Sequence, residues 1–135
     1  MPARFAPTAG LLVALGLVGC GDDALDAARE RWGAAGVVDY DFRYQTSGFV
    51  PHLDHRISVR AAQVTAAVDL AGGAAVPLID LSAEPTIVSL FDTIERRGDG
   101  ATVTYDPGDG HPVTAWFSSG EEGDGFTIPE LTRVP

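Results

Sequence analysis

The chain contains a single cysteine, Cys20, and the residues around it indicate what its thiol does. It follows Leu17-Val18-Gly19, which is an apolar residue, a tolerant position and a small residue, as in the bacterial lipobox. In such a motif the small Gly19 lets a signal peptidase approach the scissile bond, and the thiol of Cys20 receives diacylglycerol before cleavage. Two or more acyl chains give stable membrane attachment, so the motif predicts a lipid anchor at Cys20. The alternative is an ordinary signal peptide with an incidental cysteine near its cleavage point.

The segment before the cysteine has the layout of a secretory signal. Arg4 and the amino terminus precede an apolar run from Leu11 to Val18, which is shorter than the roughly 20 residues that a finished transmembrane helix needs. We therefore expect a signal peptide over residues 1–19, a lipidated N-terminus and short tether over 20–23, and a single domain over 24–135.

The charge of the chain limits its partners. It has 19 acidic residues against nine basic ones, for a formal net charge of −10. Removal of residues 1–19 takes away one arginine and no acid, which leaves a charge of −11. A field of this sign repels nucleic acid and anionic lipid headgroups. We therefore expect no nucleic-acid partner and a membrane contact made only through the lipid on Cys20.

Four residues are of the types that bind zinc: His52, Asp54, His55 and His111. A zinc site needs three or four ligands in a defined geometry. His52 and His55 are three residues apart but follow Pro51, which favours a loop, so we interpret them as solvated histidines.

Glycine–aspartate clusters offer hard oxygen ligands for calcium. The candidate residues are Asp99, Asp106, Asp109, Glu121, Glu122 and Asp124. No cluster fits the twelve-residue calcium loop, and Asp-Gly is also typical of hairpin turns. We interpret these clusters as turns and predict no bound metal or cofactor.

No catalytic constellation is evident in the sequence. Ser118 and Ser119 lack the flanking glycines of a nucleophile elbow, so we predict that the protein is not an enzyme. Trp116 and Phe117 are adjacent in a predicted strand and must point to opposite faces. We expect one of them to be exposed, and Trp116 is the predicted contact for a partner.

Two helices are predicted to position these residues. Residues 21–36 place Leu25, Ala28 and Trp32 on one helical face. Residues 86–98 form the second helix, capped by Thr86 or Ser82. Its apolar stripe consists of Ile87, Leu90, Phe91 and Ile94.

Alternating polar and apolar residues predict strands over 37–47, 54–64, 64–70, 102–106, 111–119 and 126–131. Ala61 is expected to point inward in the second strand, and residues 120–125 are expected to form a turn. Asp39 and Asp41 are expected to face Arg56 and Arg60 on the outer surface. The order α-β-β-β-α-β-β-β predicts an α+β domain with two helices packed on one antiparallel sheet.

The chain resembles small bacterial envelope lipoproteins of the domain-of-unknown-function family numbered 6174. The matching motifs are the lipobox, Trp32, Asp39-Tyr40, residues 86–94, Val103, Tyr105-Asp106, Gly110-His111-Pro112, and Asp124 followed by Phe-Thr-Ile. The resemblance implies the fold and an envelope location and adds no reaction. Many members carry a cysteine pair after the first strand, whereas residues 46–55 here contain none, so no disulfide or cysteine-based site carries over.

These observations predict a lipid-anchored lipoprotein of the bacterial cell envelope that binds a protein or peptide without catalysing a reaction. The membrane, inner or outer, stays open. An acidic protein that handles calcium or zinc is the alternative, and a small hydrolase is the third reading.

Overall fold

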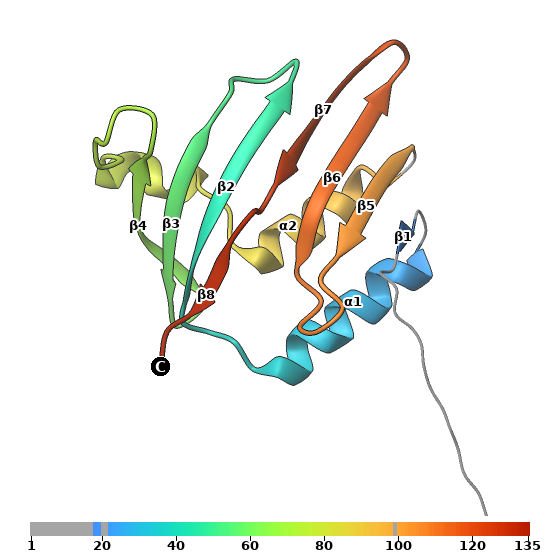
Figure 1. Ribbon diagram of the computed structural model, residues 1–135, viewed down its shortest axis with the longest axis horizontal. Coiled ribbons are helices and arrows are strands. Elements are labelled where there is room, and N and C mark those ends of the chain that lie inside the picture. Colours follow the sequence, from blue (N-terminus) through green and yellow to red (C-terminus); the bar gives the residue numbers. More distant parts are fainter. Residues whose placement is uncertain (1–17, 20–21, 99) are drawn as a thin grey trace, which may run out of the picture.

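The computed structural model describes residues 18–19, 22–98 and 100–135, which form one antiparallel sheet and three helices (Figure 1). The helices are α1 (Asp22–Ala35), the 3₁₀ helix η1 (Leu78–Ala83) and α2 (Ile87–Arg96). The strands are β1 (Val18–Gly19), β2 (Tyr40–Gly48), β3 (Asp54–Arg60), β4 (Gln63–Asp69), β5 (Ala101–Tyr105), β6 (Pro112–Ser119), β7 (Glu122–Thr127) and β8 (Leu131–Arg133).

The strands are arranged in the order β1-β5-β6-β7-β2-β3-β4, and β8 pairs separately with β2. All of these pairings are antiparallel. The first part of β2 pairs with β8, through Tyr40 to Phe42, and its second part pairs with β7, through Gln45 to Gly48. One strand therefore joins the two halves of the sheet.

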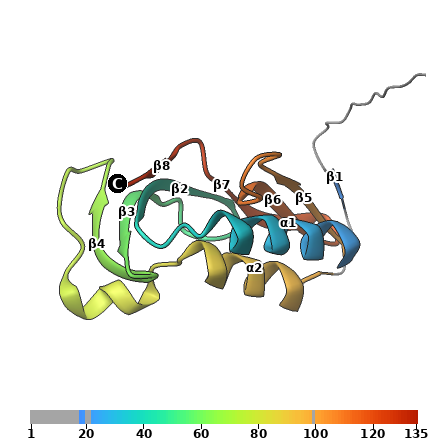
Figure 2. The same ribbon diagram turned by 90° about the horizontal axis from the view of Figure 1, so that it is seen from below.

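Both α-helices lie on the same face of the sheet, side by side (Figure 2). Helix α1 buries Leu25, Ala28 and Trp32, as its spacing predicted. The predicted stripe of α2 is also buried: Ile87, Leu90, Phe91 and Ile94. The predicted α+β class with an antiparallel sheet is confirmed. The count of two helices is wrong, because η1 is a third, and β1 and β8 were not predicted.

Helix α2 is fixed at its N-terminus by a reciprocal capping box. The hydroxyl of Thr86 accepts a hydrogen bond from the backbone N–H of Ser89 at 3.1 Å, and the hydroxyl of Ser89 accepts one from the N–H of Thr86 at 2.9 Å. The Tyr40 hydroxyl accepts a bond from the N–H of Ile87 at 3.0 Å. Two donors that the helix leaves unpaired and the N-cap donor are thereby satisfied.

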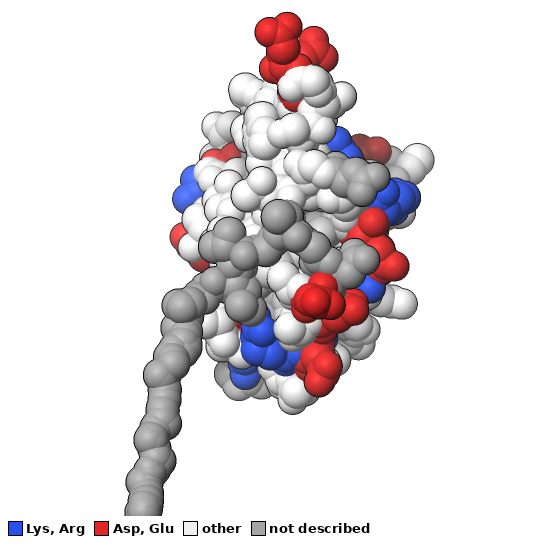
Figure 3. All heavy atoms as spheres, turned by 90° about the vertical axis from the view of Figure 1, so that its right-hand side faces the viewer, with Lys and Arg blue, Asp and Glu red and all other residues white. Residues whose placement is uncertain are grey.

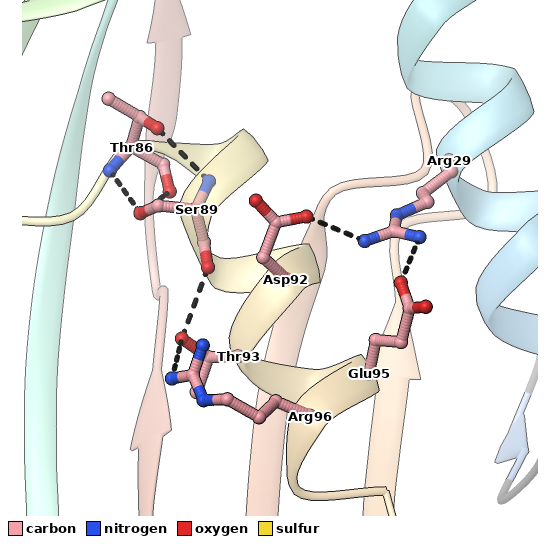
Figure 4. A network of polar contacts seen from close by, with 7 residues as sticks. All are labelled: Arg29, Thr86, Ser89, Asp92, Thr93, Glu95 and Arg96. Carbon is pink, nitrogen blue, oxygen red and sulfur yellow. Dashed lines mark hydrogen bonds and ion pairs between the residues drawn. The ribbon is translucent and has the colours of Figure 1, made fainter.

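The two α-helices are also joined by ion pairs (Figure 4). Arg29 of α1 donates to Asp92 at 2.8 Å and also to Glu95, both on α2. The carboxylates are largely exposed, so these pairs contribute at most about 1 kcal/mol each. Burial of the apolar stripes is therefore the main stabilisation between helices and sheet.

The predicted strands over 54–64 and 64–70 are separated by a turn that was not predicted, and its cause is local. Ala61 does not continue the strand: its φ is +52°, that of Ala62 is +65°, and the two form the β3–β4 turn. The N–H of Ala61 donates to the Asp39 carboxylate at 2.8 Å, which holds this turn. The predicted pairing of Asp39 with an arginine is therefore wrong.

Further differences lie in the first predicted strand (37–47), which is found as β2 from Tyr40, and at the C-terminal end. The predicted turn over 120–125 is limited to Gly120 and Glu121, because residues from Glu122 onward pair with β6. The predicted strand over 126–131 is interrupted by residues 128–130, which include Pro129, a residue with no N–H for a ladder.

Ion pairs on the face away from the helices partly follow the predicted pattern. Arg60 contacts Asp41 at 2.9 Å, as expected, but Arg56 contacts Glu130 at 3.4 Å. On the side of β5 and β1, basic groups also lie beside acidic ones (Figure 3). Some of the acidic side chains are thus paired with arginines, although the net charge of the chain is negative.

Among the residues that the structure describes, no helix combines the length and the apolar character that a membrane crossing requires.

Candidate functional site

A groove of about 510 Å³ lies between α2, the end of η1 with the residues that follow it, the β2–β3 loop, and the strands β2, β6 and β7. Its lining residues are Tyr44, Thr46, Val50, Pro51, Leu53, Ser82, Ala83, Glu84, Pro85, Ser89, Leu90, Thr93, Arg97, Phe117, Asp124, Gly125 and Phe126. Its volume lies within the 300–1,000 Å³ that is typical of ligand pockets. We call this feature the groove.

The aromatic rings of Tyr44, Phe117 and Phe126 form its apolar floor. The alternation of β2 points Tyr40, Phe42 and Tyr44 to the helix side of the sheet. The first two are 2% and 0% exposed, whereas Tyr44 is only partly covered. Its ring lies 5.7 Å from that of Phe126, which in turn lies 6.4 Å from that of Phe117. The same alternation that builds the core therefore leaves Tyr44 partly exposed at the edge of the core, over the buried rings of Phe117 and Phe126.

A buried carboxylate borders this floor. Glu84 Oε1 lies 2.6 Å from His55 Nδ1, and the two side chains are only 8% and 11% exposed. Glu84 is placed there by η1 and the residues that follow it, while His55 comes from β3. Within the described part of the chain, His55 is the one hydrogen-bond partner of this carboxylate.

A second charged pair borders the other side of the groove. Arg97 donates two hydrogen bonds to Asp124, at 2.7 and 2.6 Å. This bonding holds the pKa of Asp124 below its usual range. The Arg97 guanidinium also lies 4.3 Å from the centroid of Phe117, where it makes a cation–π contact. Both oxygens of Asp124 are thus occupied by Arg97.

Tyr44 reports on the electrostatic potential in the groove. Burial raises the pKa of Tyr44 to about 12, and the charges of Glu84 and Asp124 add to this shift. The hydroxyl is therefore protonated at neutral pH and can donate a hydrogen bond. Both carboxylates oppose a negative charge at this oxygen, which indicates a negative potential there.

The predicted zinc set is not brought together. His55 is buried in β3 against Glu84, so its interpretation as a solvated loop histidine is wrong. Asp54 accepts two hydrogen bonds from Arg43, at 2.9 and 2.8 Å. His111 lies elsewhere, packed edge-on against Trp32 with 6.4 Å between ring centroids.

A different group of possible metal ligands does converge, in the turn between β5 and β6. Asp106, Asp109 and His111 each have a ligand atom within 4.8 Å of the others. Asp109 accepts hydrogen bonds from the side chain of His111 at 2.6 Å and from its backbone at 3.0 Å. Asp106 accepts a bond from the N–H of Gly108 at 2.7 Å, as in an Asx turn.

Burial of Asp109 raises its pKa, but the hydrogen bonds and the charge of His111, with the charge of Arg133, outweigh burial and lower the pKa overall. The group combines one member of the predicted zinc set with two of the predicted calcium set. The spacing Asp-x-x-Asp-x-His is the signal that relates them in the sequence.

The remaining calcium candidates are separate from this group. Glu121 and Glu122 are exposed at the β6–β7 turn, and Asp124 is bound by Arg97. Asp99 lies outside the described residues.

Trp116 points away from the groove. Phe117 is buried at 3% exposure and Trp116 is 42% exposed, so the two have opposite faces as predicted. The indole lies against the backbone of β7, because a Cβ added at Gly123 or Gly125 would come within 2.7 or 2.9 Å of it. A role for Trp116 in contacting a partner stays a prediction.

The residues of the predicted lipobox are only partly described. Cys20 and Leu17 lie outside the described residues. Val18 and Gly19 form β1, and they pair with Thr104 and Val103 of β5. This short strand belongs to the segment that the sequence predicts to be removed.

Sequence reasoning did not identify the groove. Tyr44 falls in the predicted strand over 37–47, Arg97 falls in the predicted helix over 86–98, and Glu84 falls in no predicted element. The groove arises from packing of residues 82–85 against β2 and α2, and no short motif encodes that contact.

In a comparison with known protein families, residues 24–121 match the model of a family of unknown function, DUF6174. Comparisons with curated proteins and with solved structures gave no match. Since the matched residues make up most of the chain and include the motifs of the resemblance from Trp32 to Pro112, the chain belongs to the DUF6174 family.

Proposed function

We propose that this protein is a lipoprotein of the bacterial cell envelope, anchored through lipid on Cys20, and that its domain binds a protein or peptide partner without catalysing a reaction. The groove is the observation that carries the binding proposal. An apolar floor with a few converging polar groups is typical of sites that hold a ligand.

The arrangement of the groove favours recognition over catalysis. The carboxylates at its border already have partners within the protein: Asp124 is bound by Arg97 through both oxygens, and Glu84 is bound through Oε1 to His55. Aromatic residues are enriched among those that contribute most to binding, and the partly exposed ring of Tyr44 offers such a contact here. The partner would bury this surface and gain hydrogen bonds at the rim.

The lipid anchor is tested by the mass of the N-terminal peptide from membrane-extracted protein. We expect a peptide that begins at Cys20 and carries the mass of a diacylglycerol group. The variant Cys20→Ser should stay unprocessed and unmodified. An unmodified mature N-terminus in the wild-type protein would contradict the anchor.

Binding through the groove is tested by cross-linking pull-down from intact cells with two matched variants. Thr93→Phe fills the groove, whereas Thr102→Phe makes the same change at an exposed position of β5 on the other face. We expect wild type and Thr102→Phe to recover the same amount of one partner. The amount recovered with Thr93→Phe should be at least tenfold lower. Equal recovery with both variants would argue against the groove.

The group of Asp106, Asp109 and His111 supports a second candidate function, the handling of calcium or zinc. Two carboxylates and one imidazole provide three ligands, one short of a closed zinc site. Calorimetric titration with each metal tests this function. Heat that disappears in Asp109→Asn would support it, and no heat at millimolar metal would dismiss it.

A further inference from the structure

We infer that the groove selects a cationic group on an apolar stem, as in the side chain of a partner's lysine; this inference rests on the proposed function and names the chemistry of its ligand. The occupant is a primary ammonium group, with its alkyl chain on the aromatic floor and its charge beside Glu84.

The apolar stem matches the walls of the groove. Tyr44 and Phe126 form the floor, and Leu53 and Leu90 face it from the β2–β3 loop and from α2. A linear alkyl chain buries its methylene groups here at about 0.8 kcal/mol each in water-to-apolar transfer. Long charged side chains bind in this manner, with the stem on an apolar surface and the charge at its end.

The charge of the ligand follows from the balance of the two border pairs. Asp124 accepts both of its short hydrogen bonds from Arg97, so its charge is compensated by a guanidinium. Glu84 is bound through Oε1 to His55, and its second oxygen has no donor among the described residues. A carboxylate that is more than nine-tenths buried and retains a free acceptor favours a ligand that donates hydrogen bonds and carries positive charge.

The potential inside the groove supports the same sign. Burial is the largest cause of the raised pKa of Tyr44; the charge of Glu84 adds to it, and the charge of Asp124, which is paired with Arg97, adds less. An anionic ligand would meet this potential after losing its hydration, whereas an ammonium group is attracted by it. The net charge of −10 on the chain also favours the approach of cations from solution.

The test uses three soluble probes that differ only in the head group: n-pentylammonium, 1-pentanol and pentanoate. The full chain is held in phospholipid nanodiscs, and binding is followed through the methyl NMR signals of Leu53 and Leu90. We expect affinity to fall in the order ammonium, alcohol, carboxylate, with at least threefold between the first two.

Two glutamate variants identify the carboxylate responsible. Glu84→Gln keeps an acceptor for His55 but removes the charge, so it should bind the ammonium probe no better than the alcohol. Glu95→Gln makes the same change on the exposed side of α2 and should retain the wild-type order. The signals with 1-pentanol report whether Glu84→Gln keeps an intact groove. If that variant does not fold, the order of affinities in the wild-type protein decides alone.

Pentanoate binding as tightly as pentylammonium, or an unchanged ammonium preference in Glu84→Gln, would overturn the inference and leave the proposed groove function standing. If none of the three probes shifts the methyl signals of Leu53 and Leu90, both the inference and the proposed binding function of the groove would be overturned.

Discussion

At the scale of single residues, Gly110 allows α1 to pack closely against the turn between β5 and β6, because a glycine has no side chain. Its φ is +86°, and a Cβ there would collide with the carbonyl of Ala28 in α1. We expect Gly110→Ala to lower the free energy of unfolding by about 2 kcal/mol or more, because strain and overlap act together.

The matched control is Gly33→Ala. No atom lies within 4 Å of a Cβ at this position of α1, so the substitution should raise stability by about 0.5 kcal/mol. Urea unfolding of both variants measures these changes. Equal stability of the two variants would contradict the close approach of Gly110 to α1.

The pair of Asp109 and His111 gives a prediction of pH dependence. The pKa of Asp109 is lowered in the folded protein, so its ionisation stabilises the fold above the unfolded value of about 3.9. This contribution is lost as the pH falls from that value through the lower folded pKa. The stability difference between wild type and Asp109→Asn should therefore shrink between pH 5 and pH 2.

Urea unfolding across this pH range measures the difference. Glu121→Gln changes an exposed carboxylate in the β6–β7 turn and serves as the control. A difference for Asp109→Asn that stays constant down to pH 2 would show that this carboxylate does not carry the effect.

Single residues were predictable where a local pattern encodes their role. The stripe of Ile87, Leu90, Phe91 and Ile94 and the opposite faces of Trp116 and Phe117 follow from the periods of helix and strand. Glu84 was not predictable, because its burial depends on His55, which lies 29 residues earlier in the chain.

At the scale of elements, the N-terminus of α2 is fixed by the side chain of Thr86. Thr86→Ala removes the acceptor for the N–H of Ser89 and should lower stability by about 1 kcal/mol. Thr86→Ser retains the hydroxyl and should recover most of this loss. Thermal or urea unfolding compares the two, and equal destabilisation by serine and alanine would rule out the cap as the cause.

Helices were predicted more closely than strand boundaries. The first helix was predicted over 21–36 and is found as α1 (Asp22–Ala35), because glycine ends it and its apolar face is continuous. Residues 122–125 were predicted as a turn, since Asp-Gly favours one locally. They form part of β7 because pairing with β6 and the cover of Trp116 outweigh that local preference.

At the scale of the whole molecule, the proposed anchor and the groove define how the domain meets its partner. Helix α1 begins at Asp22, so the proposed lipid on Cys20 would hold the domain close to the membrane surface. The groove is built from elements far along the chain and could not be predicted from the sequence, whereas the anchor was predicted from four consecutive residues.

The central claim is that the groove contacts a partner in the cell envelope, and position-resolved photo-cross-linking in intact cells tests it most directly. A photoreactive amino acid at Ser82 lies at the exposed rim of the groove, and one at Thr102 lies on the opposite face, where it pairs with Trp116, so the two positions distinguish contact through the groove from contact through Trp116. We predict one discrete cross-linked species from Ser82 in the membrane fraction and none from Thr102. Cross-linking from Thr102 but not from Ser82, or from neither position, would contradict the account.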